Sequence, residues 1–176
     1  IANTTTLGLV VRPFTGFSLA VDFYDIQISD ALAPISGVSQ ALQQGCYNSG
    51  GSSALCDLLV RGAGGPASNS SPLTLVYSRP VNIAEQKAKG VDFEANYRTE
   101  LFGHPFSVRA LVTHQPDLIY SQALLPTNNQ AGISYNSTYG LLPTPKTKAS
   151  LFFHYQLTDA LALDVSERWR SGLRLA

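Results

Sequence analysis

The chain has 176 residues, and only 14% of them are charged, well below the roughly 25% typical of soluble domains. Its 12 basic and 12 acidic side chains cancel, so the charge balance does not suggest a nucleic-acid-binding protein, and no nucleic-acid partner is expected. The hydrophobic content of 44% excludes a disordered chain, and no apolar run approaches the ~18 residues of a transmembrane helix.

The first residue is Ile1, and the sequence contains no methionine. No signal peptide is recognisable at the start. We therefore expect a processed product or a segment of a longer chain.

Alternation of apolar and polar residues with a period of two predicts β-strands along most of the chain. About six strands result if 73–84 and 90–98 are parts of one strand with a bend or bulge at 86–89. The predicted strands are 6–12, 17–24 with an extension to about 28, 73–84, 90–98, 106–113, 146–156 and 161–170.

Long and short connections alternate between these strands. The long irregular segments are 29–72 and 115–145, and the first contains two possible short helices, at 37–44 and 53–60. Ser52 or Ser53 is a suitable N-cap for the second helix. In an antiparallel meander all short turns then lie at one end, as in transmembrane β-barrels.

Each predicted strand has an apolar face and a face with charges of both signs. In a soluble β-sandwich the apolar face packs inward, whereas in an outer-membrane barrel it meets lipid. Phe152 and Glu167 are exceptions, because Phe152 lies on the polar face and Glu167 lies on the apolar face. Six strands cannot close a barrel, because the smallest single-chain barrels have eight.

Several segments resemble the C-terminal half of the barrel of a TonB-dependent outer-membrane receptor. They are FSLAVDFYDIQISDA at 17–31, CYNSGGSSALCDLLVR at 46–61, KGVDFEANYR at 89–98, and 148–173 with SERWRSGL near its end. The resemblance implies an all-β fold, an antiparallel up-and-down meander of about six long strands that is a segment of a 22-stranded barrel. Residues 1–176 would be one partial barrel domain with two extracellular loops, and 73–98 one long strand.

The same resemblance implies a transporter and not an enzyme. A nutrient such as a ferric siderophore, haem, cobalamin or an oligosaccharide would be imported with energy that TonB transmits through a plug domain. The plug, a TonB box and an aromatic-ended final strand have no counterpart here, so we expect them elsewhere in the receptor. The expected location is the outer membrane of a Gram-negative bacterium, with membrane lipid, the plug and TonB as partners.

The resemblance also implies site residues. Cys46 and Cys56 would form a disulfide in the first loop, although two free thiols are the alternative. No catalytic, cofactor or metal site is expected, since His104, His114 and His154 are scattered. Lumen-facing candidates, or ordinary lumen lining, are Asp22, Asp92, Glu94, Arg98, Arg109, Asp164 and Arg168. Candidate ligand contacts, or ordinary loop packing, are Tyr47, Tyr120, Tyr135 and Tyr139.

Two other functions fit the same strands. A passive channel or adhesion barrel would have the same faces but no plug. A soluble β-sandwich would bury its apolar face and fold in water without detergent.

Overall fold

A computed structural model describes residues 1–62, 65, 72–122, 127–135 and 141–175. The contacts divide the chain into two units, which are described separately. One unit comprises residues 1, 28–86 and 120–128, and the other comprises residues 2–27, 87–119 and 129–176.

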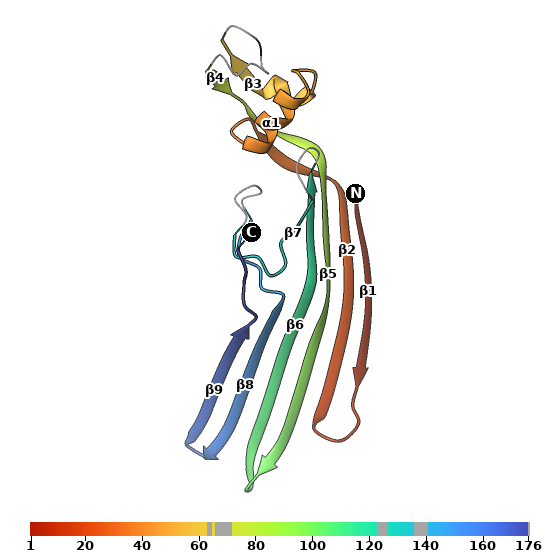
Figure 1. The fold of residues 1–176 in the computed structure, drawn as a ribbon. Helices are drawn as coiled ribbons and strands as arrows, with labels where there is room; N and C mark the ends of the chain where they lie inside the picture. The colour runs from red at the N-terminus through yellow and green to blue at the C-terminus, as the bar shows by residue number, and fades with distance from the viewer. Residues whose placement is uncertain (63–64, 66–71, 123–126, 136–140, 176) are drawn as a thin grey trace. The chain divides into compact units, whose positions relative to one another are not determined.

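The second unit is built on a meander of long antiparallel strands (Figure 1). Neighbours in the sheet follow the order β1-β2-β5-β6-β8-β9, and β7 pairs with β6 beside this path. Strands β2, β5 and β6 continue into the first unit. The bounds are β1 Ala2–Val11, β2 Phe17–Ser36, β5 Ser78–Leu101, β6 His104–Gln122, β7 Asn128–Asn129, β8 Thr147–Thr158 and β9 Leu161–Arg170.

Short turns join the strands at one end of this sheet (Figure 1). Phe102 and Gly103 connect β5 to β6, and both have positive φ angles of 53° and 79°, as a two-residue type I′ hairpin requires. Gly16 precedes β2 with φ 84°, and its carbonyl accepts the Arg98 backbone N–H at 2.8 Å. A Cβ at Gly16 would collide with the Arg98 carbonyl oxygen, so this turn requires glycine.

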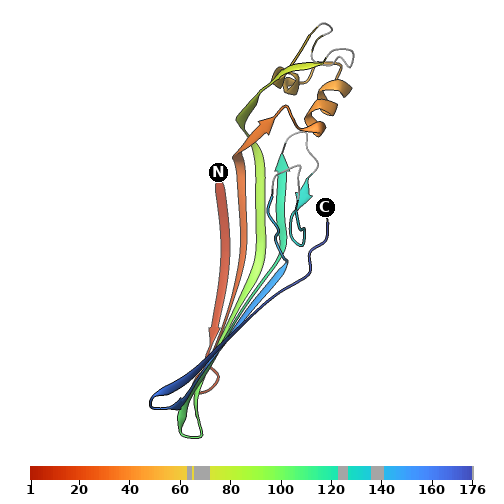
Figure 2. The same cartoon turned by 90° about the vertical axis from the view of Figure 1, so that its left-hand side faces the viewer.

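The long strands of the second unit form one layer (Figure 2), and the described part of this unit contains no helix. Their large apolar side chains are consequently exposed: Leu7 keeps 73% of its surface and Leu163 keeps 51%. A soluble sheet buries its apolar face against a second layer. This sheet has an apolar face for which the described chain provides no cover.

Register assigns residues of β6, β8 and β9 to the two faces. Val108, Phe153 and Val165 are directly paired across the three strands, and the next residues in register are Arg109, Phe152 and Ser166. Since successive side chains point to opposite faces, the first set belongs to an apolar face and the second to a polar face.

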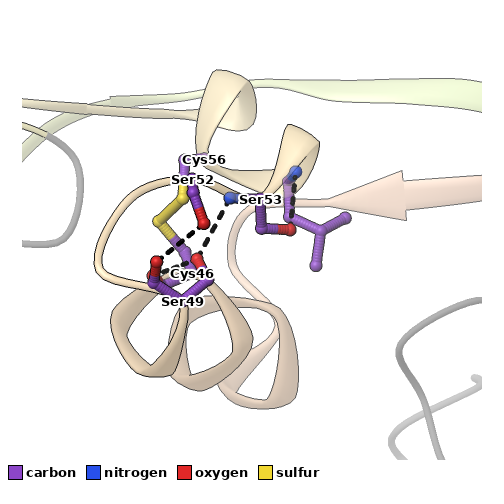
Figure 3. Close-up of a disulfide and its surroundings, with 6 residues drawn as sticks. Cys46, Ser49, Ser52, Ser53 and Cys56 are labelled. Atoms are coloured by element: carbon purple, nitrogen blue, oxygen red, sulfur yellow. Dashed lines mark hydrogen bonds between the residues drawn. A yellow bond between two sulfur atoms is a disulfide. The ribbon is translucent and has the colours of Figure 1, made fainter.

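The first unit has a small core of its own around a disulfide between Cys46 and Cys56 (Figure 3). The surrounding elements are α1 (Gln40–Asn48), the 3-10 helix η1 (Ala54–Leu58), β3 (Leu59–Arg61) and β4 (Leu73–Val76). Leu73 and Val76 are partly buried and pack against the fully buried residues of this core. Those buried residues are Leu42, Cys46, Leu55, Cys56, Leu58 and Leu59.

Serine side chains form hydrogen bonds within the segment between the two cysteines (Figure 3). The Ser49 hydroxyl donates to the Cys46 carbonyl at 2.8 Å and accepts the Ser53 backbone N–H at 3.1 Å. Ser53 caps η1, because its hydroxyl accepts the Leu55 backbone N–H. The expected N-cap is therefore confirmed as Ser53.

The predicted β-meander is confirmed, but its loops are shorter than expected. Strand β2 continues to Ser36 and β6 to Gln122, so parts of both predicted loops are strand. These ends escaped prediction because alternation weakens where neither face is strongly apolar. The first helix begins three residues later than predicted, at Gln40, and the second is the shorter η1.

The bend predicted at 86–89 is wrong, because β5 runs without interruption through these residues. The single strand implied for 73–98 is interrupted further up, at Tyr77, whose backbone N–H donates to the Leu58 carbonyl at 2.9 Å. Much of the turn-rich stretch at 61–72 lies outside the described residues.

Loss of the disulfide should loosen the first unit without unfolding the long sheet. The chain-entropy model gives about 2.5–3 kcal/mol for a loop of this length, and the two cysteines are ten residues apart. We expect Cys46→Ser with Cys56→Ser to make residues 37–76 much more sensitive to protease in intact cells. Ser52→Ala is the matched control, since its hydroxyl donates only to the neighbouring Ser49 carbonyl. Equal protease resistance of the double variant and wild type would contradict the expectation.

Candidate functional site: the polar face of the sheet

Many charged residues of the second unit lie on the polar face, among them Asp92, Glu94 and Arg109. A salt bridge links β5 to β6 on this face: Arg109 Nη2 lies 3.0 Å from Glu94 Oε1. Arg109 Nε and the Asn96 amide also donate to the same carboxylate oxygen, each at 3.0 Å. Glu94 is thus held by three donors. Both side chains of the ion pair remain exposed, so the pair is accessible to a further partner.

This network borders an open hollow of about 850 Å³ near the short turns. Two further cations, Arg12 and Arg98, line it together with Ser18. Glu94 is the acidic residue among its lining residues, beside Arg12, Arg98 and Arg109. The hollow therefore offers three guanidinium groups and one carboxylate, which suits contact with an anionic or carbonyl-rich surface.

Tyr24 covers Gly90 on the same face. A Cβ at Gly90 would meet the phenol ring of Tyr24, and it would lie 2.7 Å from the His114 carbonyl oxygen. An aromatic side chain packed over a strand glycine shields the exposed backbone and fixes register. Gly90 therefore marks a close approach and neither of the bends considered from the sequence.

Two carboxylates oppose one another beside Tyr24. In an antiparallel pair, the numbers of directly opposed residues have a constant sum. The Gly16–Arg98 hydrogen bond and the Tyr24–Gly90 contact have the same sum, so Asp22 lies opposite Asp92. The Asp92 Oδ1 atom is buried and has no hydrogen-bond partner in the described part of the chain. Like charges opposite each other destabilise a sheet, and a buried unpaired carboxylate oxygen is costly.

The far side of the polar face carries a contact between a histidine and an aspartate. His154 Nδ1 lies 2.8 Å from Asp164 Oδ1 between the directly paired strands β8 and β9. Phe152 lies one pair further along, in register with Arg109 and Ser166. Arg168 follows, paired with Ser150.

The structure places the seven predicted polar-face residues on one face, but it does not bring them into one cluster. Glu94, Arg98 and Arg109 meet at the hollow, Asp22 opposes Asp92, and Asp164 pairs with His154. Sequence reasoning missed Tyr24, Asn96 and His154 as partners, although each shares the alternation of a predicted residue. The sequence shows that these side chains are polar, but their contacts depend on the register between strands.

The opposite face has an aromatic row next to the short turns. Phe14 stacks on Phe17 with ring centroids 5.1 Å apart, and its edge meets Tyr97 at 6.3 Å. Phe106 and Tyr155 form a further T-shaped pair at 6.2 Å. Aromatic side chains in such rows mark the boundary between lipid and water in membrane barrels.

The segment after β6 folds back against that strand. Asn129 accepts the backbone N–H groups of Leu118 and Ala131, each at 3.1 Å, and donates to the Pro116 carbonyl and to Asp117. Gln130 is 1% exposed, and its amide donates to the Leu142 carbonyl at 3.0 Å. The described part of the second predicted loop is therefore ordered by amide side chains. Hydrophobic periodicity in the sequence could not have predicted these amide contacts.

The four tyrosines predicted as ligand contacts do not share one environment. Tyr47 is exposed on α1, and Tyr135 is exposed after the folded segment. The prediction that Tyr120 lies in a loop is wrong, because β6 includes it. Tyr139 lies outside the described residues.

Among the described residues, no group of three or more His, Cys, Asp or Glu side chains is arranged to hold a metal ion. No helix in this described part is long and apolar enough to cross a membrane.

A meander of long strands, one apolar face with an aromatic row and one charged face define the class of an outer-membrane barrel segment. Comparison with protein families agrees: the model for "TonB dependent receptor-like, beta-barrel" matches residues 1–176. No curated protein and no solved structure matches the chain significantly. The chain belongs to the TonB-dependent receptor β-barrel family, whose members are outer-membrane transporters of Gram-negative bacteria and not enzymes.

Adding a methyl group at Gly90 should destabilise the sheet by about 1–3 kcal/mol, as overpacking does in a filled site. Gly90→Ala would push against Tyr24 and the His114 carbonyl oxygen. Gly172→Ala is the matched control, because nothing lies within 4 Å of its added Cβ. Urea unfolding of the receptor in lipid vesicles would measure both, and equal stability of the two variants would refute the close-packing argument.

Proposed function

We propose that the chain is part of an active importer of a scarce nutrient. The candidate nutrients are a ferric siderophore, haem, a cobalamin and an oligosaccharide. Family membership supplies the class, and the division between an apolar and a charged face is the observation that carries the proposal. Residues 1–176 would be part of one 22-stranded barrel domain, with the plug and TonB as partners.

The apolar face would meet lipid, and the polar face would line the lumen. The absence of protein cover over the apolar residues in the described sheet supports this orientation, as does the aromatic row. All seven polar-face candidates then point into the lumen. They are Asp22, Asp92, Glu94, Arg98, Arg109, Asp164 and Arg168.

The plug would complete the polar face. Asp92 has a buried oxygen without a partner in the described chain, and Asp22 opposes it. A cationic or amide side chain of the plug would satisfy both carboxylates and remove their repulsion. The guanidinium groups at the hollow would contact the carboxylates or backbone carbonyls of the plug.

The nutrient would be recognised on the extracellular side, by loops that the long strands carry. Tyr47 is the best supported contact, because the disulfide core holds the helix that presents it. Tyr135 is the second, next to the segment anchored by Asn129. Tyr120 and Tyr139 stay as proposals from the sequence. Rigid aromatic side chains bind ligands at a low cost in conformational entropy.

The orientation can be tested with adjacent residues of β2. Val21 lies in the middle of the apolar row, and Ala20 is its neighbour on the polar face. Val21→Arg should destabilise the barrel by about 2–4 kcal/mol, as arginine does when it faces the lipid midplane. Ala20→Arg is the matched control and should cost much less. Unfolding in lipid vesicles measures both, and a larger cost for Ala20→Arg would reverse the assignment of the faces.

Energy coupling can be tested by nutrient uptake. Cells that lack the receptor should lose high-affinity uptake of one nutrient class, and restoring the receptor should rescue it only when TonB is functional. Uptake of labelled siderophore, haem, cobalamin and oligosaccharide would identify the class. Uptake that persists without TonB would favour the passive channel instead.

A further inference from the structure

We propose that Lys87 and Lys89 form a binding site for the phosphate of an outer-leaflet lipid headgroup. The two lysines share a face of β5 with the apolar run Tyr97, Ala95, Phe93 and Val91, and they follow that run directly. The proposal rests on the orientation proposed above, in which this face meets lipid. It concerns a contact with the membrane and is independent of the nutrient.

The two ammonium groups converge on one point of the surface. Lys87 Nζ and Lys89 Nζ lie 3.8 Å and 3.7 Å from the same Asp25 oxygen, Oδ2. These distances exceed those of good hydrogen bonds, so each ammonium retains donors for another acceptor. The lysine side chains are 40% and 41% exposed, whereas Asp25 is 27% exposed. These three side chains carry two positive charges and one negative charge, and Glu85, exposed two residues beyond Lys87, is the next charged side chain on this face of β5.

The position of this pair coincides with the edge of the apolar band. Lys89 Nζ lies 5.4 Å from the ring centroid of Phe23, which ends the apolar run Phe17, Leu19, Val21 and Phe23 of β2 before Asp25. The change from apolar to polar occurs at the same level on the neighbouring strands. His114 bonds the Thr147 hydroxyl at 2.9 Å, and the next pair on the same face toward the short turns is Val112 with Ala149.

This placement matches a lipid phosphate better than a ligand of the aqueous loops. A lysine at the edge of a hydrophobic band keeps its aliphatic stem on apolar surface and its ammonium at headgroup level. Lipid phosphates lie at that level, and each nearby lysine contributes about 1 kcal/mol of attraction to an anionic surface. Phe23 would hold the stem of Lys89 in place while the two ammonium groups share the phosphate oxygens.

The test uses the complete receptor in detergent and a bisphosphorylated glycolipid of the outer leaflet as the probe. Lys87→Gln with Lys89→Gln should weaken glycolipid binding by about thirtyfold, as expected when two such contacts are lost. Lys87→Arg with Lys89→Arg should retain binding, which shows that the charge matters and that the barrel folds. Dephosphorylated glycolipid should bind wild type as weakly as the intact lipid binds the Gln variant.

Lys148→Gln is the matched control, because Lys148 lies next to Thr147 in β8 but on the polar face, paired with Arg170. Unchanged binding in all variants would overturn the headgroup site and leave the orientation intact. A loss with Lys148→Gln alone would overturn the orientation itself. Equal losses in both would show a nonspecific charge effect and overturn the proposal. Competition by millimolar inorganic phosphate as strong as that by the glycolipid would assign the site to soluble phosphate, which also overturns it.

Discussion

The structure depends on an apolar sheet face that the described chain does not cover. A single layer of strands satisfies its backbone within the sheet but leaves side chains such as Leu7 and Leu163 exposed. In water such a surface would drive aggregation. In a bilayer the same surface is the favourable one, because lipid replaces the second layer that a soluble sheet needs. The membrane location and the meander topology therefore have a common physical cause.

The polar face follows from the same constraint. In the proposed orientation, apolar side chains occupy alternate positions, and the remaining positions would face the interior of a barrel and can be charged. Those charges require partners, and the structure supplies some of them across strands, as Arg109 does for Glu94. Others, such as Asp92, have none in the described part of the chain. A face that is only partly paired is suited to receive a plug.

The loop with the disulfide uses a different source of stability. Its apolar residues are buried by one another, since Leu42, Leu55 and Leu58 pack around the cystine. A core of this size gives little hydrophobic stabilisation by itself, and small folds of this kind need a cross-link. The chain enters this unit along β2 and leaves it along β5. The membrane part and the loop are thus stabilised by different interactions within one chain.

The sequence by itself determined the strands, the two faces, the short turns and the family, because a period of two is a local property. It also indicated the pairing of Cys46 with Cys56 by resemblance, and the structure contains this disulfide. Only the tertiary structure decided which residues meet. The contact of Tyr24 with Gly90, the opposition of Asp22 and Asp92, the anchoring by Asn129 and the approach of Lys87 and Lys89 to Asp25 all depend on register. Register is set by pairing between segments far apart in the sequence, and a shift of one residue would move every side chain to the other face.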